Sequence, residues 1–220
     1  FDLESKFQNN SNLKVGISGR YQKNFPDPYT GVKRIIPDYK KYDFSVYSIY
    51  DISFDRNWLL EGGIRYDFSH INAYKYYRTS LWEARNYDEL FPEIVVEDLG
   101  LNTLTNPKFN FNNFSSNLGT RFTINNGENI YFNYSISSRK PNPSELFSEG
   151  LHHSSARIEI GDLSFNSEVG HNISLTYNFA NEKSNLTVNS FANFVNDFIY
   201  IIPVDLMPTI AGVFPYWEYK

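Results

Sequence analysis

The chain has 220 residues, a formal net charge of −5, a mean hydropathy of −0.46 and no cysteine. These values exclude disulfide bonds and thiolate metal sites, and an acidic balance without a basic run argues against nucleic-acid binding. No run of about 18 apolar residues occurs, so a membrane-spanning helix is excluded as well. Aromatic side chains make up 18% of the sequence, and so many rings need a common environment.

Alternation of apolar and polar residues predicts strands through the first third of the chain. Strands are expected over 1–7, 13–21, 42–52 and 58–68, with the charged residues Glu61, Arg65 and Asp67 on the opposite parity from the apolar ones. A tight turn is expected at Asp55 to Asn57. Residues 22–41 contain three prolines and a glycine, which predicts a loop.

Residues 69–112 are expected to form a very long loop that is rich in rings and acids. A short helix over Trp82 to Leu90 is expected inside it. A loop of this length within a compact domain is usually either functional or disordered. Tyr76, Tyr77 and Trp82 are therefore candidates for contact with an aromatic or cationic ligand. The alternative is that these rings pack the loop against its neighbours, since large loops need a core of their own.

The second half repeats the same pattern of strands and connections. Strands are expected over 114–124, 130–136, 173–179 and 186–202, and a further strand begins at Tyr216. Asn126-Gly127 is a two-residue hairpin signal. Loops are expected over 139–169 and 203–215. The connections therefore alternate between short and long along the whole chain.

This alternation favours an antiparallel transmembrane β-barrel, because such barrels have short periplasmic turns and long extracellular loops. We expect long extracellular loops near 22–41, 69–112, 139–169 and 203–215, with apolar side chains facing lipid and rings forming aromatic girdles. About nine strands are counted, the first and last incomplete. An odd, open set would leave unpaired edges in lipid, so we expect residues 1–220 to be a portion of a larger barrel, truncated at both ends.

One motif in the 139–169 connection resembles, in its residue types and spacing, a motif of a known protein family. Its residues are Arg139, Pro141, Asn142, Glu145, Leu146, Phe147, Gly150, His152, Glu159, Gly161 and Glu168. The spacing resembles that of TonB-dependent outer-membrane receptors, whose barrels carry a late loop of the form Arg-x-Pro-Asn-x-x-Glu-Leu-aromatic, then Gly-x-His, then Glu-x-Gly-Asn and a final Glu. The departures are Asp162, where the family prefers Asn, and Phe165, where it usually has Leu.

The resemblance implies an all-β barrel of approximately 22 strands, plugged by an N-terminal domain that these 220 residues lack. It further implies a location in the outer membrane of a Gram-negative bacterium, contact with membrane lipid, and contact with the TonB complex through the plug region. The implied function is active import of a scarce ligand such as an iron-siderophore, haem or zinc. We expect no enzymatic activity and no cofactor apart from a transported metal chelate.

Two adjacent histidines, His152 and His153, are the candidate metal ligands. Neighbouring side chains in an extended chain point in opposite directions, so the two imidazoles do not favour one shared ion. Either could bind Zn²⁺ or an iron chelate with Glu149, Glu159 or a plug residue, or could simply hydrogen-bond within the loop. Arg139 and Glu145 are expected to fix the entry of the loop, with Pro141, Gly150, Glu159, Gly161 and Glu168 as structural residues of the motif.

Three other readings remain open at this point. A passive porin or a surface adhesin would have the same strand pattern without TonB-driven transport. A barrel enzyme would need a catalytic constellation, which the sequence does not display. A soluble β-sandwich would place the apolar residues of the alternating strands in a closed core.

Overall fold

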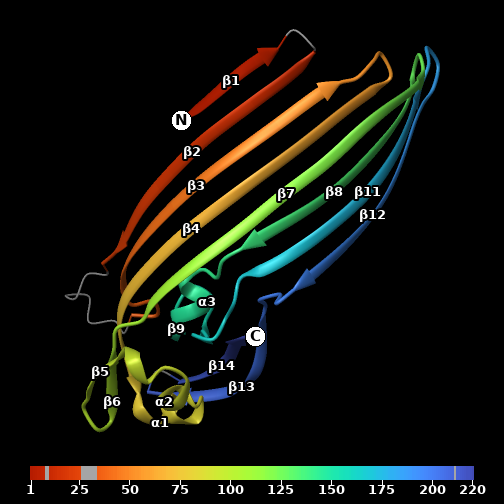
Figure 1. The fold of residues 1–220 in the computed structure, drawn as a ribbon. Helices are drawn as coiled ribbons and strands as arrows, with labels where there is room; N and C mark the ends of the chain where they lie inside the picture. Colours follow the sequence, from red (N-terminus) through yellow and green to blue (C-terminus); the bar gives the residue numbers. More distant parts are fainter. Residues whose placement is uncertain (8–9, 26–33, 211) are drawn as a thin grey trace.

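The computed structural model describes residues 1–7, 10–25, 34–210 and 212–220, and most of them lie in one large antiparallel sheet (Figure 1). In spatial order its path consists of β1 (Asp2–Phe7), β2 (Ser11–Asn24), β3 (Asp38–Ser53), β4 (Trp58–Arg78), β7 (Lys108–Asn125), β8 (Glu128–Arg139), β11 (Glu168–Ala180) and β12 (Asn185–Asn196). The strands of this path follow one another in the order of the sequence, with the strands of the long connections left out, as in an up-and-down barrel wall. The sheet is strongly curved and is not closed.

The two ends of this sheet differ in the length of their connections (Figure 1). Short turns join strands at one end, as at residues 54–57 and 181–184. The Asn126-Gly127 hairpin lies at the same end and confirms the sequence prediction. Gly127 has φ +96°, and a Cβ there would lie 2.1 Å from the carbonyl oxygen of Ala180, so only glycine fits.

The long connections gather at the opposite end, which we call the rim. They contain α1 (Thr79–Ala84), α2 (Tyr87–Leu90), the 3₁₀ helix η2 (Pro92–Ile94), β5 (Val95–Asp98), β6 (Asn102–Thr105), α3 (Pro143–Phe147), β9 (Glu149–His152), β10 (Arg157–Ile160), β13 (Ile201–Thr209) and β14 (Gly212–Tyr219). No helix in the described residues is long and apolar enough to cross a membrane.

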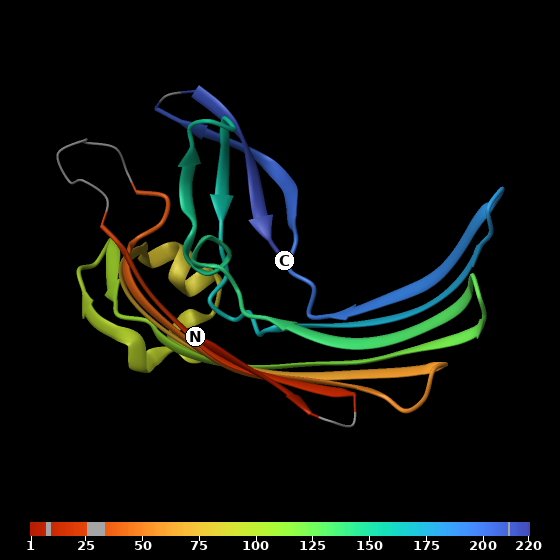
Figure 2. The ribbon, with the colours of Figure 1, turned by 90° about the horizontal axis from the view of Figure 1, so that it is seen from above.

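Four of these strands form a second, smaller sheet in the order β13-β14-β10-β9. Strand β10 pairs with β14 in parallel, whereas its pairing with β9 is antiparallel. Figure 2 shows the small sheet on the concave side of the main sheet. The 139–169 connection and the last twenty residues are therefore parts of one structure.

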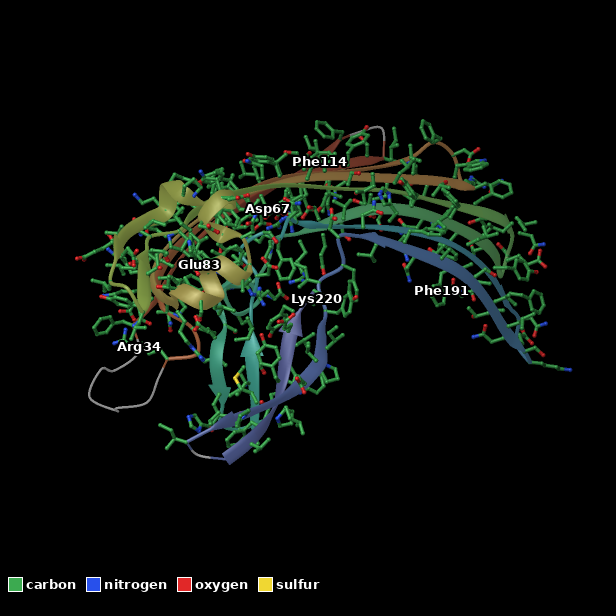
Figure 3. All side chains as sticks on the ribbon, turned by 90° about the horizontal axis from the view of Figure 1, so that it is seen from below. Arg34, Asp67, Glu83, Phe114, Phe191 and Lys220 are labelled. Atoms are coloured by element: carbon green, nitrogen blue, oxygen red, sulfur yellow. The ribbon has the colours of Figure 1, made fainter. Side chains whose placement is uncertain are left out.

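The two faces of the main sheet differ in polarity, as the alternation predicts. One cross-strand row consists of Ile17, Val46, Tyr66 and Phe114, all of them exposed. The next residues along these strands point to the other face, which carries Asp67 and other charged side chains. Figure 3 labels Phe114 on the convex face and Asp67 on the concave face.

The strand expected over 130–136 follows the same rule. Ile130, Phe132, Tyr134 and Ile136 lie on one parity of β8, and Tyr134 pairs with Leu118, which is exposed on the convex face. None of the four belongs to the buried core cluster. The apolar residues of the alternating strands therefore cover the outside of a curved sheet and do not fill a closed sandwich.

This polarity reverses near the rim. In β4 the odd positions below Phe68 carry Glu61, Arg65 and Asp67, but the buried residues above this point are the odd ones, including the apolar Ile71, Ala73 and Tyr77. Exposed aromatic residues continue on the even positions at Tyr74 and Tyr76. Strand β7 changes in the same way, because Phe109 and Phe111 pack inward whereas Phe114 points outward. The concave side of the rim therefore has a hydrophobic core of its own.

The bounds of two expected loops need correction. The 69–112 loop is shorter than expected, because β4 continues to Arg78 and β7 begins at Lys108. The reversal of the apolar parity hid these strand ends from a reading based on a single face. The expected helix over Trp82 to Leu90 is split into α1 and α2 by Asn86, which has φ +57°. Of the 22–41 loop, residues 26–33 lie outside the described part, and β2 and β3 occupy both of its ends.

The last part of the chain also differs from expectation. The expected strand over 186–202 ends at Asn196, and residues 203–215, expected as a loop, belong largely to the β13–β14 hairpin. The strand begun at Tyr216 is the end of β14 and pairs in the small sheet, so it is not a ninth strand of the main sheet. Prolines misled the reading here: Pro203 lies at a bulge, and the hairpin contains Pro208 and Pro215 as well.

Candidate functional site

Arg139, the last residue of β8, lies at the centre of the motif residues. Its guanidinium donates to both carboxylate oxygens of Glu145 at 3.0 Å and also to Glu168 at the start of β11. The second oxygen of Glu168 accepts a hydrogen bond from the backbone N–H of Ile199 at 2.6 Å. One arginine and two glutamates thus join β8, α3, β11 and the segment that follows β12.

Helix α3 begins with a capping box. Asn142 is its N-cap and Glu145 is the N3 residue, whose Oε2 accepts from the backbone N–H of Asn142 at 2.7 Å. Pro143 occupies the first turn, where its missing N–H costs nothing. The spacing from Asn142 to Glu145 therefore builds a helix start, and the same carboxylate holds Arg139.

Gly161 is required by the close approach of two backbones. Its N–H donates to the carbonyl oxygen of Ser148 at 2.7 Å, and the next N–H, of Asp162, donates to the carbonyl oxygen of Glu145 at 2.8 Å. A Cβ at Gly161 would lie 2.5 Å from the carbonyl oxygen of Glu145. Any side chain here would push α3 away from the strand that crosses it.

The other two small or rigid motif residues have weaker structural reasons. Pro141 is buried immediately before α3. Gly150 pairs with Glu159 between β9 and β10, and a Cβ there would meet only an ordinary contact with Ile35. The structure therefore explains the glycine at position 161 and gives no steric reason for the one at 150.

A cluster of buried residues, which we call the rim core, supports these contacts. It consists of Tyr39, Ile71, Ala73, Tyr77, Trp82, Tyr87, Ile94, Leu146, Phe147 and Leu163. Tyr77 and Trp82 have ring centroids 5.3 Å apart, and Trp82 and Tyr87 lie 5.2 Å apart edge to face. Such aromatic pairs stabilise a core beyond the area that they bury.

The three rings proposed as ligand contacts are not brought together. Tyr77 and Trp82 are only 4% and 3% exposed, which matches the packing alternative. Tyr76 points to the other side of β4 and is 60% exposed. It lines a cavity of about 270 Å³ together with Tyr74, Lys75 and Glu149. Of the three, Tyr76 alone is placed to meet a ligand without opening the rim core.

Lys75 and Glu149 form a buried ion pair next to this cavity. The Lys75 ammonium lies 3.2 Å from the Glu149 carboxylate, donates to the carbonyl oxygen of Phe147 at 2.7 Å, and lies 3.9 Å from the centroid of the Tyr77 ring. Both side chains are nearly inaccessible. The pair fixes β9 against the end of β4, and removal of either partner would leave a buried charge.

Arg85 makes a second junction, between three connections. It donates to the carbonyl oxygen of Gly161 at 3.0 Å, and it pairs with Asp162 at 3.5 Å and with Glu218 of β14 at 3.3 Å. The Tyr87 hydroxyl donates to Asp162 at 2.7 Å. Burial, together with the nearby Asp162 charge, raises the pKa of Tyr87 to about 12, so the hydroxyl stays protonated as a donor.

The buried side chain of Glu159 links the two strands of the β9–β10 hairpin. Its Oε1 accepts from His152 at 2.8 Å and from Arg157 at 2.7 Å. Burial acts to raise the pKa of Glu159, but these two hydrogen bonds and the positive charges outweigh burial and leave the pKa lowered. Arg157 also lies over the Trp217 ring, 4.9 Å from its centroid, which ties β10 to β14.

The two candidate metal ligands have different surroundings. His152 donates from Nδ1 to Glu159, whereas His153 is exposed in the turn between β9 and β10. In the described residues, no group of three or more His, Asp or Glu side chains is arranged to hold a metal ion. A metal role for His152 or His153 therefore stays a prediction.

Sequence reasoning missed several residues of this assembly. Lys75, Arg85 and Tyr87 lie within the expected 69–112 loop, and their partners are more than 70 residues away in sequence. One residue of the sequence pointed to such partners: Asp162 occupies a motif position, and a buried carboxylate there needs a hydrogen-bond donor. The identity of that donor depends on the fold.

Known proteins similar to this chain agree with the fold. A family model described as TonB dependent receptor-like, beta-barrel, matches residues 1–219. The Serratia marcescens hemophore receptor HasR, solved with its hemophore HasA and heme, has a TM-score of 0.64 at 16% identity over 99% of this chain and 35% of that one. The copper transporter OprC has a TM-score of 0.64 at 11% identity, over 94% of this chain and 30% of that one.

The FrpB iron transporter from Neisseria meningitidis has a TM-score of 0.57 at 14% identity, over 99% of this chain and 29% of that one. The chain thus spans about a third of the length of these structures. No curated protein matches the sequence.

Proposed function

Because this chain belongs to the family of TonB-dependent receptor β-barrels, we propose that its receptor imports a scarce ligand across the outer membrane of a Gram-negative bacterium. The observation that carries the proposal is the pair of unlike faces on one curved sheet. An apolar convex face suits lipid, and a charged concave face suits a water-filled or plugged lumen. Import would be driven through TonB, by way of a plug domain that these residues do not include.

The ligand class that we favour is a metal chelate: an iron-siderophore, haem or a zinc complex. The proteins similar in fold are named for heme, copper and iron. The rim offers the exposed Tyr76 beside a cavity, and the exposed His153 at the tip of the β9–β10 hairpin. Aromatic surface and imidazole are groups that contact such chelates.

Uptake by intact cells tests this proposal. Cells with the full-length receptor gene would be given radiolabelled iron-siderophore, haem or zinc, with and without a functional TonB. We expect uptake of one ligand class to require both the receptor and TonB. Uptake that persists without TonB and extends to unrelated small solutes would support a passive porin instead, and surface attachment without uptake would support an adhesin.

Ligand binding by the purified full-length receptor tests the residues. If the histidines contact the chelate, His152→Ala and His153→Ala should weaken binding at least tenfold. His171→Ala is a matched control, because His171 lies in the main sheet and bonds to Tyr134 through Nδ1 at 2.9 Å. Unchanged affinity in both rim variants would show that neither histidine is a ligand. Tyr76→Ala, compared with Tyr66→Ala on the outer face, tests the cavity in the same assay.

A further inference from the structure

We propose that the outer face of the sheet binds the phosphate groups of an anionic outer-leaflet lipid through Lys23, Lys40 and Lys108. The three lysines come from strands β2, β3 and β7, and nothing in their sequence spacing connects them. The inference rests on the proposed location in an outer membrane. It concerns the lipid-facing surface and not the transported ligand.

Strand register places the three lysines in one row. Lys23 pairs with Lys40, Lys40 pairs with Asn72 of β4, and Asn72 pairs with Lys108. All three lysines are exposed. They share the parity of the convex apolar face, so they point outward together.

Within the described part of the chain, the charges in this row have no acidic partner. Lys23, Lys40 and Lys108 make no ion pair with another described residue, and the nearest outward acid along β3, Asp38, is paired with Arg34 at 2.8 Å. Outward positions between the row and the short turns, on these four strands, carry no aspartate or glutamate. Like charges placed directly opposite, as in the Lys23–Lys40 pair, destabilise a sheet unless an anion lies between them.

The row lies at the height where lipid headgroups would be. Trp58 packs on Phe122 at the short-turn end, with ring centroids 4.6 Å apart, as expected for an interface girdle. From Trp58 to Asn72 there are fourteen residue steps along β4. At about 3.3 Å per residue and a tilt of about 40°, these span roughly 35 Å.

The hydrocarbon core is about 30 Å thick. The lysine row therefore lies just beyond it, in the headgroup layer. One row below are Tyr21 and Tyr42, with ring centroids 5.0 Å apart, which complete a second aromatic girdle. An outward cationic row directly above a girdle fits a phosphate on a lipid whose acyl chains cover the apolar band.

A binding measurement on the full-length receptor in detergent micelles tests the proposal. Diphosphoryl lipid A is the probe, and native mass spectrometry counts the bound lipid. The row variant combines Lys23→Gln, Lys40→Gln and Lys108→Gln, and we expect it to bind about a hundredfold more weakly. The attraction of one lysine to an anionic surface is on the order of 1 kcal/mol, which is about a fivefold change in the dissociation constant. Three such lysines together give about a hundredfold change.

The matched control removes three cations from the other end of the sheet: Lys6→Gln, Arg56→Gln and Lys183→Gln. These side chains are exposed near the short turns, and we expect less than a threefold change. Lys→Arg at the three row positions should retain binding. If the row variant does not fold, the three single variants should each weaken binding about fivefold.

Unaltered binding by the row variant, or an equal loss in the control variant, would overturn the proposal. So would displacement of the lipid by inorganic phosphate at equal concentration, because the site would then be one for free phosphate. TonB-dependent uptake is measured on the same variants. Normal uptake with unaltered lipid binding would remove the lipid site and leave the proposed function standing.

Discussion

The part of the main sheet between the short turns and the rim, which we call the lower sheet, exposes its apolar side chains on the convex face, whereas the rim buries apolar side chains on the concave side. The same strands run through both parts. In β4, Ile64 and Tyr66 are exposed on the outward parity. Above Phe68 the apolar residues Ile71, Ala73 and Tyr77 lie on the inward parity and join the rim core, although Tyr74 and Tyr76 remain exposed on the outward one. The difference follows from what surrounds each part. A lipid-facing wall needs apolar groups outside, whereas a structure that stands in water needs them inside. The position at which a strand leaves the membrane is therefore marked by a change in which parity, odd or even, carries the apolar residues that pack against their surroundings.

The largest expected effect comes from a ring of the rim core. Trp82→Ala should destabilise the rim by about 3–5 kcal/mol, the usual cost of such a truncation in a packed core. Hydrogen exchange of residues 79–107 measures this directly. Phe114→Ala, on the lipid-facing side, should change exchange in the rim very little. Equal effects of the two variants would mean that the rim has no independent core.

A charge placed on either face of one strand tests the lower sheet. Leu118 points outward and the adjacent Asn117 points inward, where it bonds to Glu61. Leu118→Arg should cost about 1–3 kcal/mol in a bilayer, somewhat less than a cation at the midplane because Leu118 lies closer to the short-turn interface. Asn117→Arg should cost less than ~1 kcal/mol. Unfolding from lipid vesicles by denaturant measures both, and the reverse order would place the membrane on the concave side.

A smaller effect is expected at the junction between the two regions. Arg139→Gln removes the cation shared by Glu145 and Glu168, and both carboxylates are largely inaccessible. We expect a loss of about 2 kcal/mol, below that of a fully buried pair because Arg139 is itself 41% exposed. Protease cleavage of the 139–169 connection in the folded receptor is the measurement. Lys183→Gln, in a short turn, serves as the control and should not alter cleavage.

The smallest expected effect is a loss of rim stability at low pH. Glu159 and Asp162 have lowered pKa values in the folded rim. For both groups burial acts to raise the pKa, and hydrogen bonds with positive charges outweigh it. Carboxylates of this kind stabilise the fold above their unfolded pKa, and the contribution is lost as the pH falls through the folded value.

We therefore expect the rim to loosen below about pH 4, by on the order of 1 kcal/mol for each group. Exchange of β9 and β10 measures this loosening. Glu159→Gln should flatten the pH dependence. A rim that is equally stable at pH 7 and pH 3 would contradict the assigned hydrogen bonds.

Much of the fold could be predicted because the lower sheet obeys a two-residue period. Alternation located its strands, the Asn126-Gly127 turn, and the order of short and long connections. Prediction failed where the period changes phase. Ile71, Ala73 and Tyr77 continue β4 on the other parity, so a reading based on the outward face ended the strand too early.

The candidate site was predictable in part and for a different reason. Glu145 and Gly161 act through local geometry, a helix cap and a close backbone approach, which spacing in the sequence can reveal. Arg85 depends on the packing of three connections against one another. The row of Lys23, Lys40 and Lys108 depends on strand register. The register between strands cannot be predicted from a single sequence until it is known which strands pair.

The parallel pairing of β10 with β14 has a consequence for the order of assembly. Ile158 meets Tyr216, and the whole β11–β12 hairpin lies between them in the chain. Hairpins close within microseconds, but a contact across such a long separation must wait until the intervening strands have taken their places. We therefore expect the β9–β10 and β13–β14 hairpins to close early and the pairing of β10 with β14, which unites them into the small sheet, to form last during biogenesis.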